Sequence, residues 1–360
     1  MSRARAACVA AVRVRLDALL VDRDRNFPRR DPTNTRQLRD VLAEYTAALR
    51  CARDPAWQPD LARLGAARGR LDSPTSICGF MRSGTTLLAD LLDGHPELVV
   101  LPGDSHMTSV GEDARRERER DAYWIPVLVT PRGQVPFWFF GDADHPYAEF
   151  VGYLDHVLAT GEGGARGRFL AYVTALQCAN PTAPHGLRTW VEKTPENEFR
   201  VDEVREWFPG TRFIHIIRDP FETLASVKRL FIERGWGWKP WSVVTTAKKL
   251  SESIAAADRH RRRLGAGRYH VLRYEDLVER PREQMSEVAH FLGVAWDDAL
   301  LTPTMNGART KPNSMYRDRL GVRGCVADTR GARWRQVLTP PERLIARALL
   351  RRAGRRWGYA

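Results

Sequence analysis

The sequence predicts an α/β fold in which a central parallel sheet lies between layers of helices. Short apolar runs typical of buried strands alternate with helical patterns along the chain, at residues 76–78, 98–101, 188–191, 213–217 and 269–273. The run at 213–217 is apolar at nearly every position, as expected of a parallel strand that is buried on both faces. In such sheets ligands bind beyond the carboxyl ends of the strands, so the residues that follow each run are the first candidates for a site.

The chain before the first strand predicts a helical N-terminal extension over residues 1–72, which leaves residues 73–360 for the α/β domain. Apolar side chains recur at helical spacing between residues 35 and 52, and the pattern ends before Pro55 and Pro59. The members of this apolar face are Leu38, Val41, Leu42, Tyr45 and Leu49. We expect the extension to pack on the rest of the chain.

The composition favours a folded, basic protein. Hydrophobic residues make up 43%, and 57 Lys and Arg against 44 Asp and Glu give a net charge of +13, which suits an anionic ligand, a nucleic acid or a membrane surface. The five cysteines are dispersed without a C-x-x-C pair, which predicts no zinc site and suits a reducing compartment. No apolar run approaches the roughly 18 residues of a membrane span, and Arg13 and Arg15 interrupt the N-terminal apolar run. We therefore expect no transmembrane segment and a cytoplasmic protein.

A glycine-bearing turn at residues 79–86, Gly-Phe-Met-Arg-Ser-Gly-Thr-Thr, joins the first strand to a helical pattern that ends near Gly94. Its spacing is that of G-x-x-x-x-G-K-[ST], except that Thr85 takes the lysine position and the cation comes earlier, at Arg82. Backbone N–H groups at such a helix N-terminus point at an anion, and the helix dipole adds to the attraction. The turn therefore predicts a phosphate cradle, with an ordinary strand-to-helix turn as the alternative. Loss of the lysine argues against ordinary ATP chemistry.

A second strand-to-helix junction follows the run at 213–217. Asp219 suits the N-cap position, Pro220 the first helical position, and Glu222 completes a capping-box-like spacing. Arg218 ends the strand and Ser226 lies about two turns into the helix, so that a guanidinium and a hydroxyl could both reach a phosphate.

These motifs resemble those of the sulfotransferases that use 3′-phosphoadenosine 5′-phosphosulfate (PAPS). In that family the 5′-phosphosulfate loop typically reads P-[RK]-S-G-T-T-x-L, and here Met81 replaces the proline. The family grips the 3′-phosphate with an arginine and a serine eight residues apart, which Arg218 and Ser226 match. Residues 192–195, Glu-Lys-Thr-Pro, are similar to the K-T-P segment of carbohydrate and bacterial sulfotransferases, in which the lysine, here Lys193, lies close to the transferring sulfuryl group.

Residues 273–277, Pro281 and residues 291–294 resemble a further run of the family, R-Y-E-D-L…P…F-L-G-V, so that the resemblance spans about 77–294. It implies a P-loop-type three-layer fold, a sulfotransferase domain over residues 73–360, and PAPS as the co-substrate without a metal. It also implies in-line attack by a hydroxyl of a small-molecule, carbohydrate or lipid acceptor. The run itself is expected to support the sheet, with Tyr274 as a candidate contact of the nucleotide. The motifs leave the oligomeric state open, a homodimer included.

The resemblance also assigns candidate site residues. The loop contacts to the donor are Arg82, Ser83, Gly84, Thr85 and Thr86. Arg82 and Lys193 are the catalytic cations, because sulfuryl transfer resembles phosphoryl transfer in depending on positioning and charge stabilisation. No cluster of carboxylates suggests a magnesium site.

A base must take the proton of the acceptor hydroxyl, and the candidates are Asp104 and His106, which follow the second strand. Some sulfotransferases place a catalytic Glu-x-His there, and the shorter aspartate ranks just ahead of the histidine, whose unperturbed pKa suits the task. The alternative is that Asp104 caps a helix and His106 has no role. Arg330 and Arg333 partly match a basic segment ahead of a tryptophan that closes over the nucleotide in the family.

Aromatic and arginine-rich segments allow two interpretations each. Residues 123–147 are either a packed region or an apolar acceptor wall made of Tyr123, Trp124, Phe137, Trp138, Phe139, Phe140 and Tyr147. Packing is favoured over an acceptor lid for Trp236, Trp238 and Trp241. Residues 317–356 hold twelve arginines against three acids and include a last helix that begins with a capping box at 339–342. The apolar stripe of this helix is predicted to be Leu344, Ile345, Ala348 and Leu349.

Two other classes of function compete with sulfuryl transfer. A P-loop kinase acting on a small molecule would need the missing lysine and magnesium carboxylates. A nucleic-acid-binding protein would use the basic tail, but the sequence shows no helix-turn-helix, zinc or RNA-binding signature, so no specific nucleic-acid partner is expected.

Overall fold

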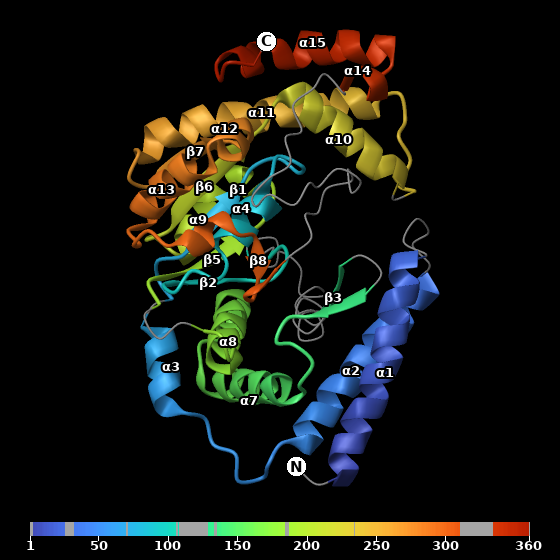
Figure 1. The fold of residues 1–360 in the computed structure, drawn as a ribbon, viewed down its shortest axis with the longest axis vertical. Helices are drawn as coiled ribbons and strands as arrows, with labels where there is room; N and C mark the ends of the chain where they lie inside the picture. Colours follow the sequence, from blue (N-terminus) through green and yellow to red (C-terminus); the bar gives the residue numbers. More distant parts are fainter. Residues whose placement is uncertain are drawn as a thin grey trace. The chain divides into compact units, whose positions relative to one another are not determined.

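The computed structural model describes residues 3–25, 32–69, 71–105, 107, 129–132, 135–183, 187–233, 235–309 and 334–359, and its contacts divide the chain into two units (Figure 1). The first unit comprises residues 1–71 and 106–185, and the second comprises residues 72–105 and 186–360. The contacts thus group residues 106–185 with the N-terminal helices, and the domain boundary at residue 72 stays a prediction. Among the helices described, none has the length and apolarity that crossing a membrane requires.

The first unit is built from helices and one β-hairpin. Its elements are α1 (Arg3–Arg25), α2 (Pro32–Ala52), α3 (Leu61–Arg68), β3 (Val129–Arg132), β4 (Val135–Trp138), α7 (His145–Thr160) and α8 (Gly164–Ala179). Helices α1 and α2 lie side by side, α7 packs on α8, and α2 also contacts α7. The helix expected at 35–52 is confirmed, and Val41, Leu42, Tyr45 and Leu49 are buried as its pattern predicts. The side chain of Leu38 lies outside the described part of the chain.

Aromatic side chains form the core of the first unit. Trp138, Phe139, Phe140 and Tyr147 are buried, and the rings of Trp138 and Tyr147 meet edge to face with centroids 5.2 Å apart. The guanidinium of Arg13 lies 3.8 Å from the Trp138 ring centroid. These four residues therefore pack the unit, and the acceptor-wall interpretation is wrong for them. Tyr123, Trp124 and the side chain of Phe137 lie outside the described residues.

The second unit contains the predicted parallel sheet. Its strands are β1 (Thr75–Cys78), β2 (Leu98–Val100), β5 (Thr189–Lys193), β6 (Arg212–Ile217) and β7 (Tyr269–Arg273). They lie in the order β2-β5-β1-β6-β7, and every neighbouring pair is parallel. Strand β1 is central, with Ile77 opposite Lys193 on one side and Ile214 on the other. The sheet predicted from the apolar runs is confirmed.

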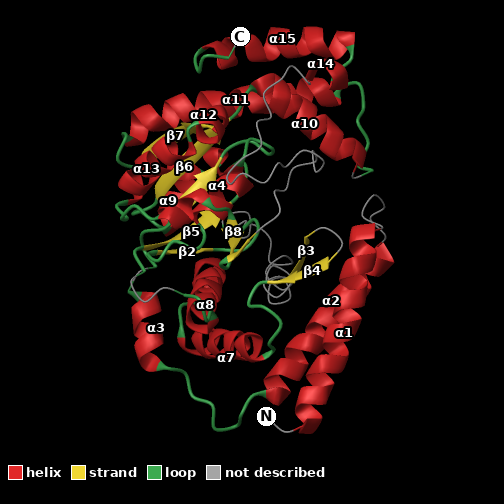
Figure 2. Ribbon diagram, in the orientation of Figure 1, coloured by secondary structure: helices red, strands yellow, loops and turns green. Residues whose placement is uncertain are grey.

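Helices cover both faces of this sheet, as the α/β pattern predicts (Figure 2). They are α4 (Thr85–Leu92), the short η1 (Asn197–Phe199), α9 (Val201–Trp207), α10 (Pro220–Glu233), α11 (Ser242–Leu264), α12 (Tyr274–Glu279), α13 (Pro281–Leu292), the short η2 (Asp298–Leu301), α14 (Trp334–Val337) and α15 (Pro340–Arg355), together with a hairpin of β8 (Thr304–Met305) and β9 (Ala308–Arg309). Alternate residues of β6 separate the faces. Ile214 and Ile216 pack in a core with α4, α12 and α13, whereas Ile217 packs with Ala257 of α11.

The junction that begins α10 is capped differently from its sequence pattern. Asp219 Oδ1 accepts hydrogen bonds from the N–H groups of Phe221 and Glu222, 2.8 and 3.0 Å away, so the predicted cap is confirmed. The N–H of Asp219 donates to Glu275 Oε1 at 2.9 Å instead of to Glu222. The Glu222 side chain accepts from the N–H of Trp334. A residue from α12 thus completes the box, because β6 and β7 are neighbours in the sheet.

Helix α15 starts at the predicted capping box but buries a different face. Thr339 and Glu342 make both reciprocal bonds of the box. Ile345 and Leu349 are half-buried as predicted, yet Leu344 and Ala348 are exposed. The buried line runs through Ala346 and Leu350 of the helix, which pack in a core with α10 and α11. The predicted stripe is therefore wrong in two of its four positions.

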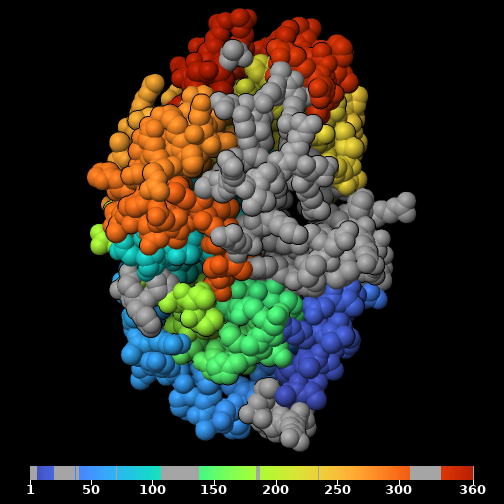
Figure 3. All heavy atoms as spheres, viewed as in Figure 1, coloured from blue at the N-terminus to red at the C-terminus, as the bar shows by residue number. Residues whose placement is uncertain are grey.

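A buried ion pair ties α10 to α15. Lys228 Nζ lies 2.6 Å from Glu342 Oε2 and also donates to the carbonyl of Val337 at 3.0 Å. Trp238 Nε1 donates to the other oxygen of Glu342 at 2.7 Å. Burial alone would raise the pKa of Glu342, but the hydrogen bonds from Lys228, the Thr339 N–H and Trp238 hold that pKa below its ordinary value. Figure 3 shows α15 (red) at the surface beside α10 (yellow), as this linkage requires.

Replacement of Lys228 tests how much its ion pair with Glu342 contributes to stability. Lys228→Met leaves the Glu342 carboxylate buried without its partner, so we expect the free energy of unfolding to fall by on the order of 3 kcal/mol. Urea denaturation followed by circular dichroism measures the change. Lys248→Met, at an exposed position of α11, is the matched control and should leave stability within about 0.5 kcal/mol. Equal stability of the two variants would contradict the assigned role of the pair.

Candidate functional site

The carboxyl ends of the five strands bring the predicted site residues to one edge of the sheet. β1 leads into the loop at 79–86, β5 ends at Lys193, and Asp104, Arg218 and Tyr274 follow β2, β6 and β7. Because all the strands are parallel, these five positions lie on the same side of the sheet. The residues that follow the strands, named as candidates from the sequence, thus share one edge of the sheet, while the function of each residue stays a prediction.

The loop depends on its two glycines. Gly79 has φ +133°, and a Cβ there would lie 2.3 Å from the carbonyl oxygen of Ile216 on the neighbouring strand. Gly84 has φ +112°, and a Cβ there would lie 2.5 Å from the ring of Tyr274. Positive φ and close approach both require glycine, so the loop is held tightly against β6 and α12. Glycines are therefore needed five residues apart in the sequence because the loop packs on its neighbours at these two positions.

Arg82 connects the loop to the second strand-to-helix junction. Its backbone takes φ +69°, which is uncommon for a residue with a side chain. Its Nε donates to Ser226 Oγ at 3.2 Å, and its carbonyl oxygen accepts from Arg218 Nη1 at 3.3 Å. Two elements separated by more than a hundred residues thus form one cluster of hydrogen bonds. We take this contact between the loop and the Arg218–Ser226 pair as the centre of the candidate site.

Tyr274 lies against both parts of this cluster. Its ring faces the guanidinium of Arg218, with 4.5 Å from Cζ to the ring centroid, and its edge packs on Gly84. A cation over an aromatic face is favourable, and the contact restricts where the guanidinium can lie. The position of Tyr274 is therefore set by packing, and its ring borders the loop that the sequence assigned to a phosphate.

The start of α4 offers hydrogen-bond donors to an anion. Gly84 is its N-cap and has no side chain that could satisfy the first N–H groups of the helix. Thr85 is buried and Thr86 is half-buried in the first turn. Ser83 is 2% exposed, and its Oγ has no hydrogen-bond partner among the described residues. A buried hydroxyl without a partner is costly, and a ligand oxygen in the loop would satisfy it.

Lys193 and Asp104, two predicted catalytic residues, form an ion pair. Lys193 Nζ donates to Asp104 Oδ1, and the lysine side chain is the more deeply buried of the two. The N–H of Ser105 donates to the carbonyl of Lys193 at 3.2 Å, which holds the two strand ends together. The predicted cation and the predicted base therefore act on each other. Residues 106 and 108–128, which follow Asp104, lie outside the described part of the chain, so its alternative role as a helix cap stays a prediction.

Glu192 lies fully buried behind this pair. Its carboxylate accepts hydrogen bonds from the hydroxyls of Ser76, Ser105 and Thr194 and from Asn197 Nδ2, the last at 2.9 Å. Burial raises the pKa of Glu192, and these hydrogen bonds work in the opposite direction. The carboxylate thus connects β1, the segment after β2 and the segment after β5. Sequence reasoning treated this residue only as a neighbour of the K-T-P motif and missed the role.

Glu198 is a second buried carboxylate, and it holds the start of the loop. Its Oε2 accepts from the N–H of Gly79 at 3.0 Å, and Ser253 of α11 donates to its other oxygen. The carbonyl oxygen of Gly79 is also bound, because it accepts a hydrogen bond from the N–H of Glu196 at 3.0 Å. Burial raises the pKa of Glu198 to about 7. An acidic residue five positions after the K-T-P lysine was the only available signal, and sequence reasoning did not use it.

Several predicted residues cannot be placed at the site. His106, Arg330 and Arg333 lie outside the described residues. Of the tryptophan cluster, Trp238 packs in the core of α10 and α15, as favoured from the sequence, whereas Trp236 and Trp241 are 41% and 61% exposed. Among the described residues no group of three or more His, Cys, Asp or Glu side chains is arranged to hold a metal ion.

The raised pKa of Glu198 predicts a pH-dependent contribution to stability. A carboxyl with a folded-state pKa of about 7 and an ordinary pKa of 4.5 contributes fully below pH 4.5, and the contribution is lost as the pH rises through 7. Glu198→Gln removes the titration and keeps an oxygen that can accept from Gly79. We expect the wild type to lose on the order of 2 kcal/mol more than this variant between pH 5 and pH 8 in urea denaturation.

Glu206→Gln provides the matched control for this measurement. Glu206 is an exposed carboxylate of α9, so its replacement should leave the difference between pH 5 and pH 8 as it is in the wild type. A Glu198→Gln variant that shows the same pH dependence as Glu206→Gln would contradict the assigned state of Glu198.

Known proteins with similar sequences or folds include sulfotransferases. Nodulation protein NoeE of Sinorhizobium fredii is 26% identical over 296 residues, which cover 74% of this chain and 61% of that protein. A protein-tyrosine sulfotransferase of Drosophila melanogaster is 26% identical over 229 residues, which cover 62% of this chain and 39% of that protein. The chain thus matches less than two thirds of the length of either relative. The solved sulfotransferase domain from the curacin biosynthetic pathway shares the fold with a TM-score of 0.56 and 19% identity, over 81% of this chain and 99% of that domain.

The model of the sulfotransferase family matches residues 74–298. This range begins one residue before β1 and ends at the start of η2, so it contains the whole parallel sheet and every site residue placed above. The chain belongs to the sulfotransferase family.

Proposed function

We propose that the chain transfers a sulfuryl group from PAPS to a hydroxyl acceptor. The observation that carries the proposal is the contact between the loop at 79–86 and the Arg218–Ser226 pair, made through Arg82. A donor with phosphates on both its 5′ and 3′ positions needs two anion sites that face one nucleoside. The two strand-to-helix junctions that follow the neighbouring strands β1 and β6 would provide such a pair.

The donor-binding roles follow from the chemistry of each part. The N–H groups and hydroxyls of Ser83, Gly84, Thr85 and Thr86 would hold the 5′-phosphosulfate, and the partnerless Ser83 Oγ fits that use. Arg218 and Ser226 would hold the 3′-phosphate, for which a guanidinium fork is well suited. Tyr274 would fix the Arg218 guanidinium from the other side. Arg330 and Arg333 remain proposed contacts on the strength of the sequence alone.

Arg82 and Lys193 are proposed as the catalytic cations. Lys193 ends β5, next to β1 and therefore next to the loop, and its ammonium is held by Asp104. A cation fixed before the reaction can stabilise the negative charge that builds up on the bridging oxygen as the sulfur–oxygen bond breaks. The acceptor hydroxyl would give its proton to a base while its oxygen attacks the sulfur in line, and adenosine 3′,5′-bisphosphate would leave as the sulfur–oxygen bond to the phosphate breaks.

Asp104 and His106 are the proposed bases, with Asp104 ranked first. Asp104 is the more accessible member of its pair with Lys193, with 38% of its side chain exposed against 9% for the lysine. An acceptor that approaches this edge would therefore meet the carboxylate before the ammonium. Through its ion pair with Lys193, Asp104 would also orient the lysine ammonium. Asp104 could serve both as the base and as this positioning residue.

The acceptor is proposed only by class. It is a hydroxyl of a small molecule, a carbohydrate, a lipid or a protein, since the Drosophila relative is a protein-tyrosine sulfotransferase. From the sequence alone we propose a cytoplasmic location. We also propose that the protein uses neither a specific nucleic-acid partner nor a metal ion. The kinase alternative is not favoured by any described residue, because Thr85 occupies the position of the phosphate-binding lysine.

Labelled donor tests the reaction and the role of Lys193 together. With radiolabelled PAPS and a panel of sugar, lipid, phenol and tyrosine-peptide acceptors, the wild type should label at least one acceptor. Lys193→Met should lower the rate by about 10²–10³-fold while the affinity for adenosine 3′,5′-bisphosphate changes little, because the cation acts mainly in the transition state. Lys248→Met is the control and should retain the full rate. The proposal fails if calorimetry detects no binding of the bisphosphate and no acceptor is labelled.

A second measurement isolates the 3′-phosphate contact. Ser226→Ala removes one hydroxyl near a phosphate, so we expect the dissociation constant for adenosine 3′,5′-bisphosphate to rise about tenfold. The affinity for adenosine 5′-monophosphate, which has no 3′-phosphate, should stay unchanged in the same variant. Ser286→Ala, at an exposed position of α13, should alter neither affinity. An equal loss for both nucleotides would place Ser226 elsewhere in the site.

A further inference from the structure

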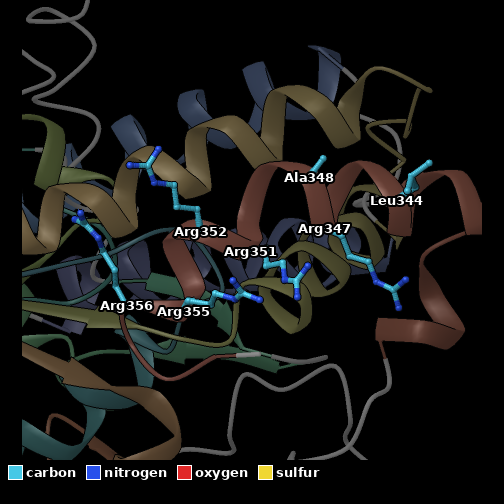
Figure 4. Close-up of a pocket in the computed structure, with 7 residues that line it drawn as sticks. All are labelled: Leu344, Arg347, Ala348, Arg351, Arg352, Arg355 and Arg356. Atoms are coloured by element: carbon cyan, nitrogen blue, oxygen red, sulfur yellow. The ribbon is translucent and has the colours of Figure 1, made fainter.

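The outer face of α15 carries a concentration of arginines around exposed apolar residues. A surface depression along this face is lined by Leu344, Arg347, Ala348, Arg351, Arg352, Arg355 and Arg356 (Figure 4). At roughly 100° per residue these positions fill one half of the helix circumference, with Leu344 and Ala348 between the arginines. The other half packs on the core through Ala346 and Leu350. The arginines are therefore fixed to a docked helix.

The charge of this face is largely uncompensated within the described part of the chain. Arg356 pairs with Asp258 of α11 at 3.2 Å. Arg347, Arg351, Arg352 and Arg355 make no ion pair or hydrogen bond to the described residues, and the only acid of α15, Glu342, is engaged by Lys228. Figure 4 shows Arg347, Arg351 and Arg355 directed to one side of the helix and Arg352 and Arg356 to the other. Such rows present guanidinium forks to phosphates on both sides of an apolar line.

Exposed apolar side chains also occur close to the first turns of α15. Leu344, in the first two turns of α15, is 70% exposed. The segment that leads from α10 to α11 carries Trp236 and Trp241, which are 41% and 61% exposed, and Ile232 before them is 56% exposed. This segment is joined to the first turn of α15 by the hydrogen bond from Trp238 to Glu342. Large exposed apolar residues next to a basic row are unlike an ordinary solvated helix face.

We propose that this surface, made of the outer face of α15 and the exposed residues Ile232, Trp236 and Trp241, docks on an anionic lipid bilayer. The arginines would contact lipid phosphates, while Leu344 and the indoles would enter the headgroup layer, where amphipathic rings are favoured. A nucleic acid would satisfy the arginines equally well, but its backbone gives no use to an exposed leucine and isoleucine. Charge complementarity and the apolar residues together favour the bilayer.

Vesicle sedimentation tests the proposal directly. The whole protein should bind vesicles of phosphatidylcholine mixed with phosphatidylglycerol, should bind vesicles of phosphatidylcholine alone much more weakly, and should dissociate as salt is added. Each arginine near an anionic surface is worth about fivefold in partitioning, so the triple variant Arg347→Gln, Arg351→Gln, Arg355→Gln should bind about 100-fold more weakly. Glutamine preserves the helix.

A charge-matched control separates this surface from the overall basic charge. Arg188→Gln, Arg205→Gln and Arg282→Gln remove three exposed arginines from other elements of the second unit and should change vesicle binding by less than about threefold. Equal losses in the two triple variants would overturn the proposal, as would a wild type that does not bind the mixed vesicles. Both variants should keep their affinity for adenosine 3′,5′-bisphosphate, so failure here is distinguishable from failure of the proposed function.

The apolar part has its own control. Leu344→Ser should weaken binding to the mixed vesicles severalfold, whereas Leu61→Ser, at a similarly exposed position of α3, should not. Duplex DNA and RNA are measured in parallel. If Leu344→Ser has no effect and the α15 triple variant loses nucleic-acid binding to the same degree as vesicle binding, the surface is a nucleic-acid site and the lipid proposal is wrong.

Discussion

The candidate site depends on the backbone of one residue, Arg82. Its left-handed conformation turns the carbonyl to Arg218 and the side chain to Ser226, so that a single residue joins the two elements proposed to bind anions. This arrangement requires β1 and β6 to be parallel neighbours in register, with Cys78 opposite His215. It also requires Gly79 and Gly84, whose missing Cβ atoms let the loop lie against Ile216 and Tyr274. The register of the sheet and the conformation of the loop together therefore fix the distance between the two proposed anion sites.

Two buried carboxylates stiffen this arrangement from behind. Glu198 holds the N–H of Gly79, and Glu192 gathers hydroxyls from three segments that end at the same edge of the sheet. Burial raises the pKa of both carboxyls, because removal from water disfavours the ionised form. Such groups are retained where they hold neighbouring elements in fixed positions. In this chain the elements they hold are the loop, Ser105 and the segment that carries Lys193, which the proposed sulfuryl transfer requires to remain in place.

The sequence could predict those features that are encoded locally. Apolar runs gave the five strands, and the glycine spacing gave the loop, because a strand, a turn and a cap each depend on neighbouring residues. Glu192 and Glu198 were missed, since their partners come from segments distant in sequence, such as Ser76 and Ser253. The capping box at α10 was predicted with Glu222, but the bond is made by Glu275, which reaches Asp219 only because β6 and β7 pair. The stripe of α15 failed for the same reason: Leu344 and Ala348 fit a helical period, and only tertiary packing decides which half of the helix is buried.

The hydrogen bonds and ion pairs of the carboxylates at the edge of the sheet limit the kind of anionic ligand that the proposed site could bind. Asp104 is paired with Lys193, Asp219 caps α10, and Glu192 and Glu198 are occupied by hydroxyl and amide donors. A nucleoside triphosphate site needs carboxylates or hydroxyls disposed to hold magnesium between phosphate oxygens. Asp219, Glu192 and Glu198 are instead engaged by hydrogen-bond donors of the protein, and Asp104 is paired with Lys193. Apart from the partly exposed Asp104, the groups left to face a ligand are N–H groups, hydroxyls and fixed cations. That set suits the proposed donor, whose charge would be neutralised by side chains. The forked cation of Arg82 contacts Ser226 from the loop, and a guanidinium has several N–H groups with which it could also contact the proposed ligand.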